Sequence, residues 1–89
     1  MARNGERVAP KRLITLTSEG FLLDGATGET YTLNATGIII VRALLQGQDS
    51  REIWRDVHAA CEVAERDARR DTDEFLAQLR VFELVEPAQ

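Results

Sequence analysis

The sequence predicts an α+β domain in which a three-stranded antiparallel sheet comes before three helices. The first third of the chain holds short runs rich in β-branched and aromatic residues, separated by glycine-containing turns. The remainder carries apolar residues at helical spacing, with side chains typical of helix caps in front of them. The chain has 89 residues, a length suited to one domain. This order of elements matches a winged-helix outline with the sheet placed first.

The three strands are predicted at residues 13–17, about 20–24 and 30–33. The segment DGATGE lies between the second and third strands, and its Asp-Gly pair and second glycine are typical of a hairpin turn. Residues 1–12 contain Gly, Pro and mostly basic charged residues without periodicity. We therefore expect them to form a flexible basic N-terminal segment, followed by a single domain at 13–86.

The three helices are predicted at residues 35–46, 50–61 and 64–82. Asn34 stands directly before a long apolar run, which is the position of an N-cap residue, and Gly47 follows the first helix as glycine does at a C′ position. The β-branched residues of this run also suit a strand, but the two flanking signals together predict a helix.

Two sets of positions are distinguished on the third helix. Steps of four and three residues define a core stripe of Ala68, Thr72, Phe75, Leu79 and Phe82. Leu76 is expected on the flank of this stripe, at about 100° from Phe75. Its neighbours there are Arg69, Asp73 and Arg80, and an apolar residue surrounded by charges on a helix flank is suited to the floor of a groove. A lone exposed Leu without function is the alternative.

Charge and composition narrow the classes of function. The net charge is −4, whereas a nucleic-acid-binding protein usually presents a basic face. The arginines of the third helix alternate with acidic residues, which weakens, without removing, the alternative of a winged-helix DNA-binding regulator. A single cysteine permits no disulfide within the chain, and no apolar run is long enough to span a membrane. We expect a cytoplasmic protein without a membrane partner.

Few residues are suited to catalysis or to metal binding. His58 and Cys61 are three residues apart on a predicted helix, but nothing nearby completes a metal site or a catalytic group of three. Ser50 follows Asp49, as the modified serine does in phosphopantetheine carrier proteins, but Arg51 follows where an apolar residue is usual. A carrier protein is therefore the less favoured alternative, and we expect neither enzymatic activity nor a cofactor.

The third predicted strand, Thr30 to Leu33, has one edge without a partner in the predicted sheet. Proteins usually protect such edges with charge or proline, and this strand has neither. A peptide can add to an edge of this kind as a further strand. The residues alone leave open whether a peptide binds there or whether residues 1–12 cover the edge.

Two stretches carry a resemblance to a known family. They are GFLLDGATGETYTLNATGIIIVRALLQGQDSREI and, after a gap, DEFLAQLRVFELV. Together they resemble the PqqD-like family, the precursor-peptide recognition elements of ribosomal peptide natural-product pathways. The resemblance covers about residues 13–85, and its most specific part is YTLNATG, residues 31–37, with LLQG at residues 44–47. Glu83 departs from the pattern, because glycine is usual at that position.

The resemblance implies a non-catalytic adaptor that binds the leader of a precursor peptide antiparallel to the third strand and against the third helix. It resembles most the stand-alone copies that serve lasso peptide clusters, and it implies a leader peptidase, a cyclase or a radical enzyme as further partners. A monomer or a weak dimer is expected, because an exposed edge also permits edge-to-edge pairing. The implied peptide-binding residues are Glu29, Thr30, Tyr31, Thr32, Leu33, Arg69, Thr72, Asp73, Leu76 and Arg80.

Overall fold

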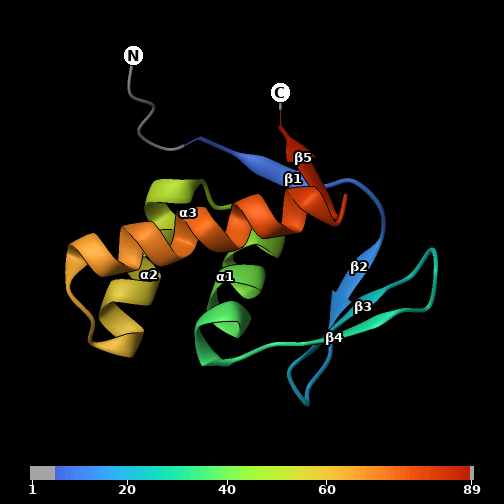
Figure 1. Cartoon of the computed structure of the whole chain (residues 1–89), viewed down its shortest axis with the longest axis horizontal. Coiled ribbons are helices and arrows are strands. Elements are labelled where there is room, and N and C mark those ends of the chain that lie inside the picture. The colour runs from blue at the N-terminus through green and yellow to red at the C-terminus, as the bar shows by residue number, and fades with distance from the viewer. Residues whose placement is uncertain (1–5, 89) are drawn as a thin grey trace.

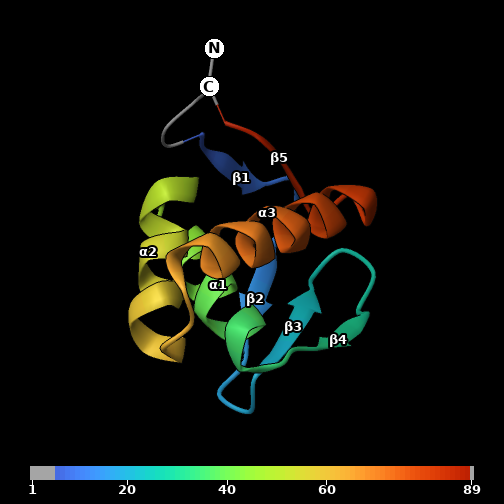
Figure 2. The same ribbon diagram turned by 60° about the vertical axis from the view of Figure 1, so that its left-hand side comes forward.

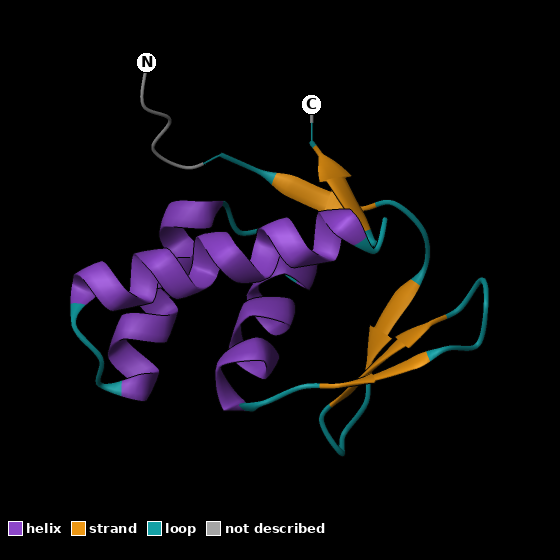
Figure 3. Cartoon of the chain, in the orientation of Figure 1, coloured by secondary structure: helices purple, strands orange, loops and turns teal. Residues whose placement is uncertain are grey.

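The computed structural model describes residues 6–88, which form three helices and two small sheets (Figure 1). The elements follow in the order β1 (Val8–Pro10), β2 (Ile14–Leu16), β3 (Phe21–Asp24), β4 (Thr30–Thr32), α1 (Ala35–Leu45), α2 (Ser50–Cys61), α3 (Glu65–Val81) and β5 (Val85–Pro87). The helices gather at one end, and strands β2, β3 and β4 lie at the other (Figure 3). None of the helices in residues 6–88 combines the length and the apolar character needed to span a membrane.

The predicted three-stranded sheet is confirmed, with β3 in the middle and antiparallel to both neighbours. In the β3–β4 hairpin, Phe21 is opposite Thr32 and Leu22 is opposite Tyr31. The connecting turn closes through hydrogen bonds that the Asp-Gly segment predicts, because the Gly28 N–H donates to the Asp24 carbonyl at 2.7 Å. Each observed strand is shorter than its predicted range by one or two residues.

A second sheet forms where a flexible segment was expected. Strand β1 pairs antiparallel with β5, so that two segments far apart in the sequence lie side by side (Figure 2). The Lys11 N–H extends this pairing by donating to the Leu84 carbonyl at 2.9 Å. The expectation that residues 1–12 lack regular structure is therefore wrong for Val8–Pro10, while residues 1–5 lie outside the described chain. A three-residue strand has no detectable periodicity, and its partner is at the far end of the sequence.

The predicted helices are confirmed to within one residue at each end, and side-chain caps fix the starts of α1 and α2. The Asn34 side chain accepts a hydrogen bond from the Gly37 N–H at 2.8 Å, which caps α1. Asp49 and Glu52 form a reciprocal capping box at the start of α2, with both hydrogen bonds at 2.9 Å. Helix α2 ends at Cys61, and its C-cap residue Glu62 has a left-handed φ of 55°.

The core lies between the three helices and both sheets, and it includes Leu76. This side chain is 5% exposed and packs in the same cluster as Val8 and Val85. The expected position of Leu76 on an exposed helix flank is therefore wrong, because the β1–β5 sheet covers that flank. Phe82, expected in the core stripe, is instead 47% exposed. The buried face of α3 is thus rotated towards β1 relative to the sequence-based expectation.

Candidate functional site

Within residues 6–88, strand β4 is the outer strand of its sheet and has one backbone edge without a partner strand. The Asp24 N–H donates to the Glu29 carbonyl at 2.8 Å, so this pair is hydrogen-bonded. Hydrogen-bonded pairs alternate along an antiparallel ladder, which makes Leu22 and Tyr31 the next such pair. The N–H and C=O groups of Thr30 and Thr32 therefore point away from β3. They are free to pair with a further strand.

An apolar hollow of about 140 Å³ lies between β4 and α3. Leu22, Tyr31, Thr32, Leu33, Phe75, Gln78, Leu79, Phe82 and Leu84 line it. The rings of Tyr31 and Phe82 meet across it with their centroids 5.6 Å apart and their planes inclined by 44°. Such a tilted pair is a favourable aromatic geometry, and it leaves half-exposed ring surface beside the free edge.

The hydroxyl of Tyr31 is held at the outer end of this site. It donates a hydrogen bond to Glu29 Oε1 at 3.0 Å. That hydrogen bond is the main reason why the pKa of Tyr31 is raised, with smaller contributions from desolvation and from the negative charges of Glu29 and Asp24. The phenol is therefore neutral at physiological pH, and its ring is held against Phe82.

The first turn of α1 determines how closely α3 approaches this site. Gly37 has no side chain there, and a Cβ at this position would lie 3.0 Å from Cε1 of the Phe75 ring. Because glycine leaves this space open, Phe75 packs directly against α1 while its ring also lines the hollow. The Asn34 cap, which bonds to the Gly37 N–H, holds the turn in place.

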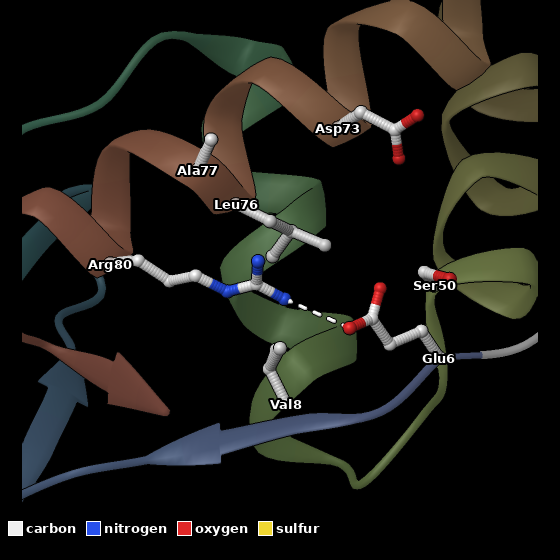
Figure 4. A pocket seen from close by; sticks show the side chains of 7 residues that line it. All are labelled: Glu6, Val8, Ser50, Asp73, Leu76, Ala77 and Arg80. Carbon is white, nitrogen blue, oxygen red and sulfur yellow. Dashed lines mark hydrogen bonds and ion pairs between the residues drawn. The ribbon is translucent and has the colours of Figure 1, made fainter. Parts of the chain in front are cut away.

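The residues predicted on α3 do not lie beside β4. Asp73, Leu76 and Arg80 line a separate hollow of about 330 Å³ on the side of β1 (Figure 4). There Arg80 forms an ion pair with Glu6 at 3.3 Å. Thr72 is fully buried, and its hydroxyl has no hydrogen-bond partner within the described chain.

Arg69, another predicted residue, lies against α2, with its guanidinium 5.3 Å from the ring centroid of Trp54. Among the described residues, no arginine lines the hollow beside β4, so Arg69 and Arg80 are not placed to contact a peptide there. The α3 residues that do line it are Phe75, Gln78, Leu79 and Phe82.

The sequence pattern assigns three of these four residues to the core stripe and does not single out Gln78. The sequence carries no signal for this assignment, because the predicted helix reaches residue 82, whereas the observed helix ends at Val81 and leaves Phe82 at its C-cap. A residue at that position is covered only if another element packs over it. Here Tyr31 of β4 is the neighbour, and it leaves almost half of Phe82 exposed.

The one histidine and the one cysteine each lie close to a polar group of the domain itself. His58 Nδ1 lies 2.6 Å from the Val63 carbonyl, and Cys61 Sγ lies 3.7 Å from Thr36 Oγ1. Between residues 6 and 88, no three His, Cys, Asp or Glu side chains are grouped closely enough to hold a metal ion.

The fold and the site together define an α+β domain with an open sheet edge beside an apolar helix face. The chain belongs to the PqqD family, because the sequence profile of coenzyme PQQ synthesis protein D matches residues 19–85. The resemblance noted in the sequence is thereby confirmed. A search of the curated proteins found no match.

A solved structure is also similar over nearly the whole chain. It is described as lasso peptide synthetase B1 complexed with the leader peptide. The two chains share 32% identity and superpose with a TM-score of 0.71, covering 91% of this chain and 96% of the other. At 32% identity, the two proteins are similar in sequence as well as in fold.

Proposed function

We propose that this protein is a non-catalytic adaptor that binds the leader region of a ribosomally made precursor peptide. The leader adds to β4 as a further antiparallel strand. The observation that carries the proposal is the free edge of β4 beside the apolar hollow, in a fold similar to that of a protein solved with its leader peptide. Backbone pairing supplies affinity in this mode of recognition, and the pockets beside it supply specificity.

The geometry of the edge sets the arrangement of the peptide. Thr30 and Thr32 offer their outward N–H and C=O groups two residues apart, a spacing of about 7 Å along the strand. Alternate side chains of the added strand then point towards the hollow, which is lined by Tyr31, Leu33 and Phe82. An apolar leader side chain suits this lining best, because burial of apolar surface against the two rings stabilises the complex.

The adaptor presents the bound leader to modifying enzymes in the cytoplasm, among them a leader peptidase, a cyclase or a radical enzyme. Leader binding removes the exposed edge, so the complex is expected to be monomeric even where the free domain forms weak edge-to-edge dimers. The reducing cytoplasm is compatible with a single cysteine that is free and partly buried.

Titration of the domain with the leader encoded beside its gene tests the proposal. Amide signals of residues 29–34 should shift in an NMR spectrum. Thr32→Pro removes an outward N–H that the native sheet does not use, so affinity should fall by roughly tenfold or more while the fold is retained. Thr32→Ala is the matched control, since it keeps the N–H and should bind nearly as the native chain does.

Two results would contradict the proposal. One is a saturating leader that leaves the amide signals of 29–34 unchanged. The other is equal affinity of the proline and alanine variants at Thr32, which would show that the backbone edge is not the binding element.

A further inference from the structure

A basic groove lies between α2 and α3, away from the site described above. Arg51, Trp54, Arg55, His58, Glu65 and Arg69 line a hollow of about 310 Å³. Helix α2 and the first turns of α3 lie at the opposite end of the molecule from β4 (Figures 1 and 3). A ligand in this groove and a peptide on β4 therefore do not compete for space.

The groove is positive in an otherwise acidic protein. Three guanidinium groups face one carboxylate there, whereas the whole chain has a net charge of −4. Within the described residues, Arg51 and Arg55 form no ion pair. Arg69 pairs with Glu65 at 3.7 Å, but both side chains are more than half exposed, and such pairs are weak and readily exchanged.

Trp54 holds two of these arginines in place. The guanidinium of Arg55 lies 5.9 Å, and that of Arg69 5.3 Å, from the centroid of the Trp54 ring. Both distances are within the range of a cation–π contact. A stacked guanidinium keeps its in-plane N–H donors free, and those donors match the two oxygens of a carboxylate. The groove thus presents N–H donors of Arg55 and Arg69 that stacking on Trp54 holds in position, so that binding a carboxylate costs little side-chain entropy.

We propose that this basic groove, formed by Arg51, Trp54, Arg55 and Arg69, is a docking site for an acidic segment of a partner protein. The charge of the groove is complementary to a short run of Asp or Glu side chains. The proposal goes beyond leader binding and does not depend on it, because the groove and β4 share no residue.

A nucleic acid fits the surface less well. Arginines further along α3 are already engaged by acids: Arg70 lies 3.4 Å from Asp67, and Arg80 lies 3.3 Å from Glu6. On α3 outside the groove, Arg66 is the one arginine without an ion pair among the described residues, and Glu65 and Asp67 adjoin it, so these arginines do not form the continuous positive face that a phosphate backbone needs. A few carboxylates at one place satisfy the groove, whereas a longer polyanion would meet these acidic residues.

The test uses acetylated, amidated hexaglutamate as the probe and Trp54 as the reporter, because the chain has a single tryptophan. We expect saturable changes in Trp54 fluorescence and in its indole N–H signal at low salt. Both changes should disappear near 1 M salt, where screening shortens the range of charge interactions to about 3 Å. The paired variant Arg51→Ala with Arg55→Ala should bind the probe roughly tenfold more weakly.

The matched control is Arg66→Ala with Arg70→Ala, which removes the same charge from exposed positions outside the groove. This control should bind hexaglutamate within about twofold of the native chain, and both double variants should still show leader-induced shifts at 29–34. Absence of those shifts already in the native chain would contradict leader binding and leave the groove proposal standing.

Three outcomes would overturn the groove proposal. The first is the absence of a saturable response of Trp54 to hexaglutamate. The second is an equal loss of hexaglutamate affinity in both double variants, which would show that the probe responds only to the net charge of the protein. The third is the finding of another occupant of the groove. That occupant would be a nucleic acid if a single-stranded oligonucleotide of equal charge binds more tightly than hexaglutamate. It would be a second copy of this chain if the protein forms a dimer that Arg51→Ala with Arg55→Ala abolishes.

Discussion

Helix α3 has a strand on each side, and the two sides differ in what is already paired. On one side β1 has β5 as its antiparallel partner, and Pro10 and Pro87 terminate the two strands. On the other side β4 pairs only with β3, and Thr30 and Thr32 keep outward N–H and C=O groups. Figure 2 shows the β1–β5 pair and β4 on opposite sides of α3.

The hollows beside these two strands differ in the same way. The hollow beside β1 is polar, and the ion pair between Arg80 and Glu6 crosses it (Figure 4). The hollow beside β4 is apolar and borders the exposed part of Phe82. The β4 edge thus differs from the β1–β5 pair in two respects: among the described residues, its outward backbone groups have no strand partner, and the apolar side chains beside it are partly exposed.

The largest expected effect tests whether Leu76 belongs to the core or to a peptide groove. Leu76→Ala should lower the free energy of unfolding by about 2–5 kcal/mol, because a 5% exposed leucine leaves a cavity when it is truncated. Chemical denaturation measures this loss. Leu76→Met preserves volume and should keep leader affinity unchanged. If Leu76→Met kept full stability but bound the leader more weakly, Leu76 would have to be counted among the peptide-binding residues.

The next effect tests the β4 side of α3 directly. Phe82→Ala should weaken leader binding about tenfold, because its exposed ring is available to cover an apolar leader side chain. Loss of the ring pair with Tyr31 should cost only about 1 kcal/mol of stability. Calorimetric titration measures the affinity.

The neighbouring residue supplies the control for this prediction. Val81 is 78% exposed and does not line the hollow. Val81→Ala should therefore leave leader affinity unchanged, and a loss as large as that of Phe82→Ala would argue against a specific apolar contact.

A smaller effect is expected on the β1 side. Arg80→Ala removes the pair with Glu6, in which the two side chains are 41% and 53% exposed. Unfolding free energy should change by at most about 1 kcal/mol, and leader affinity should stay as it is. Glu6→Gln should have a matching small effect on stability. A clear loss of leader affinity in Arg80→Ala would extend the binding site across α3.

The smallest effect concerns the ionisation of Tyr31. Its pKa should lie above the usual value, because the neutral hydroxyl donates to Glu29. The stabilisation from this hydrogen bond is present at lower pH and is lost as the pH rises through the raised pKa. Ultraviolet absorbance follows the titration cleanly, since the chain has one tyrosine. Glu29→Gln should move the pKa down, and an unchanged value would exclude this cause.

Local interactions made much of the fold predictable. The Asn34 cap, the Asp49–Glu52 capping box and the Asp-Gly hairpin each join residues no more than four positions apart. Their signals are therefore present in the sequence itself. The same holds for the strand at Thr30–Thr32, whose proposed role as an open edge follows from a hairpin that ends at a helix cap.

The side of α3 that meets each sheet was decided only by the tertiary structure. The helical repeat places Leu76 and Phe75 about 100° apart, and the pattern alone does not say which of them is covered. The pairing of Val8–Pro10 with Val85–Pro87 joins two segments far apart in the sequence and covers Leu76. Because burial depends on what packs against a helix, the sequence by itself determined the elements and their caps. The fold decided which apolar residues close the core and which remain beside β4 for a partner.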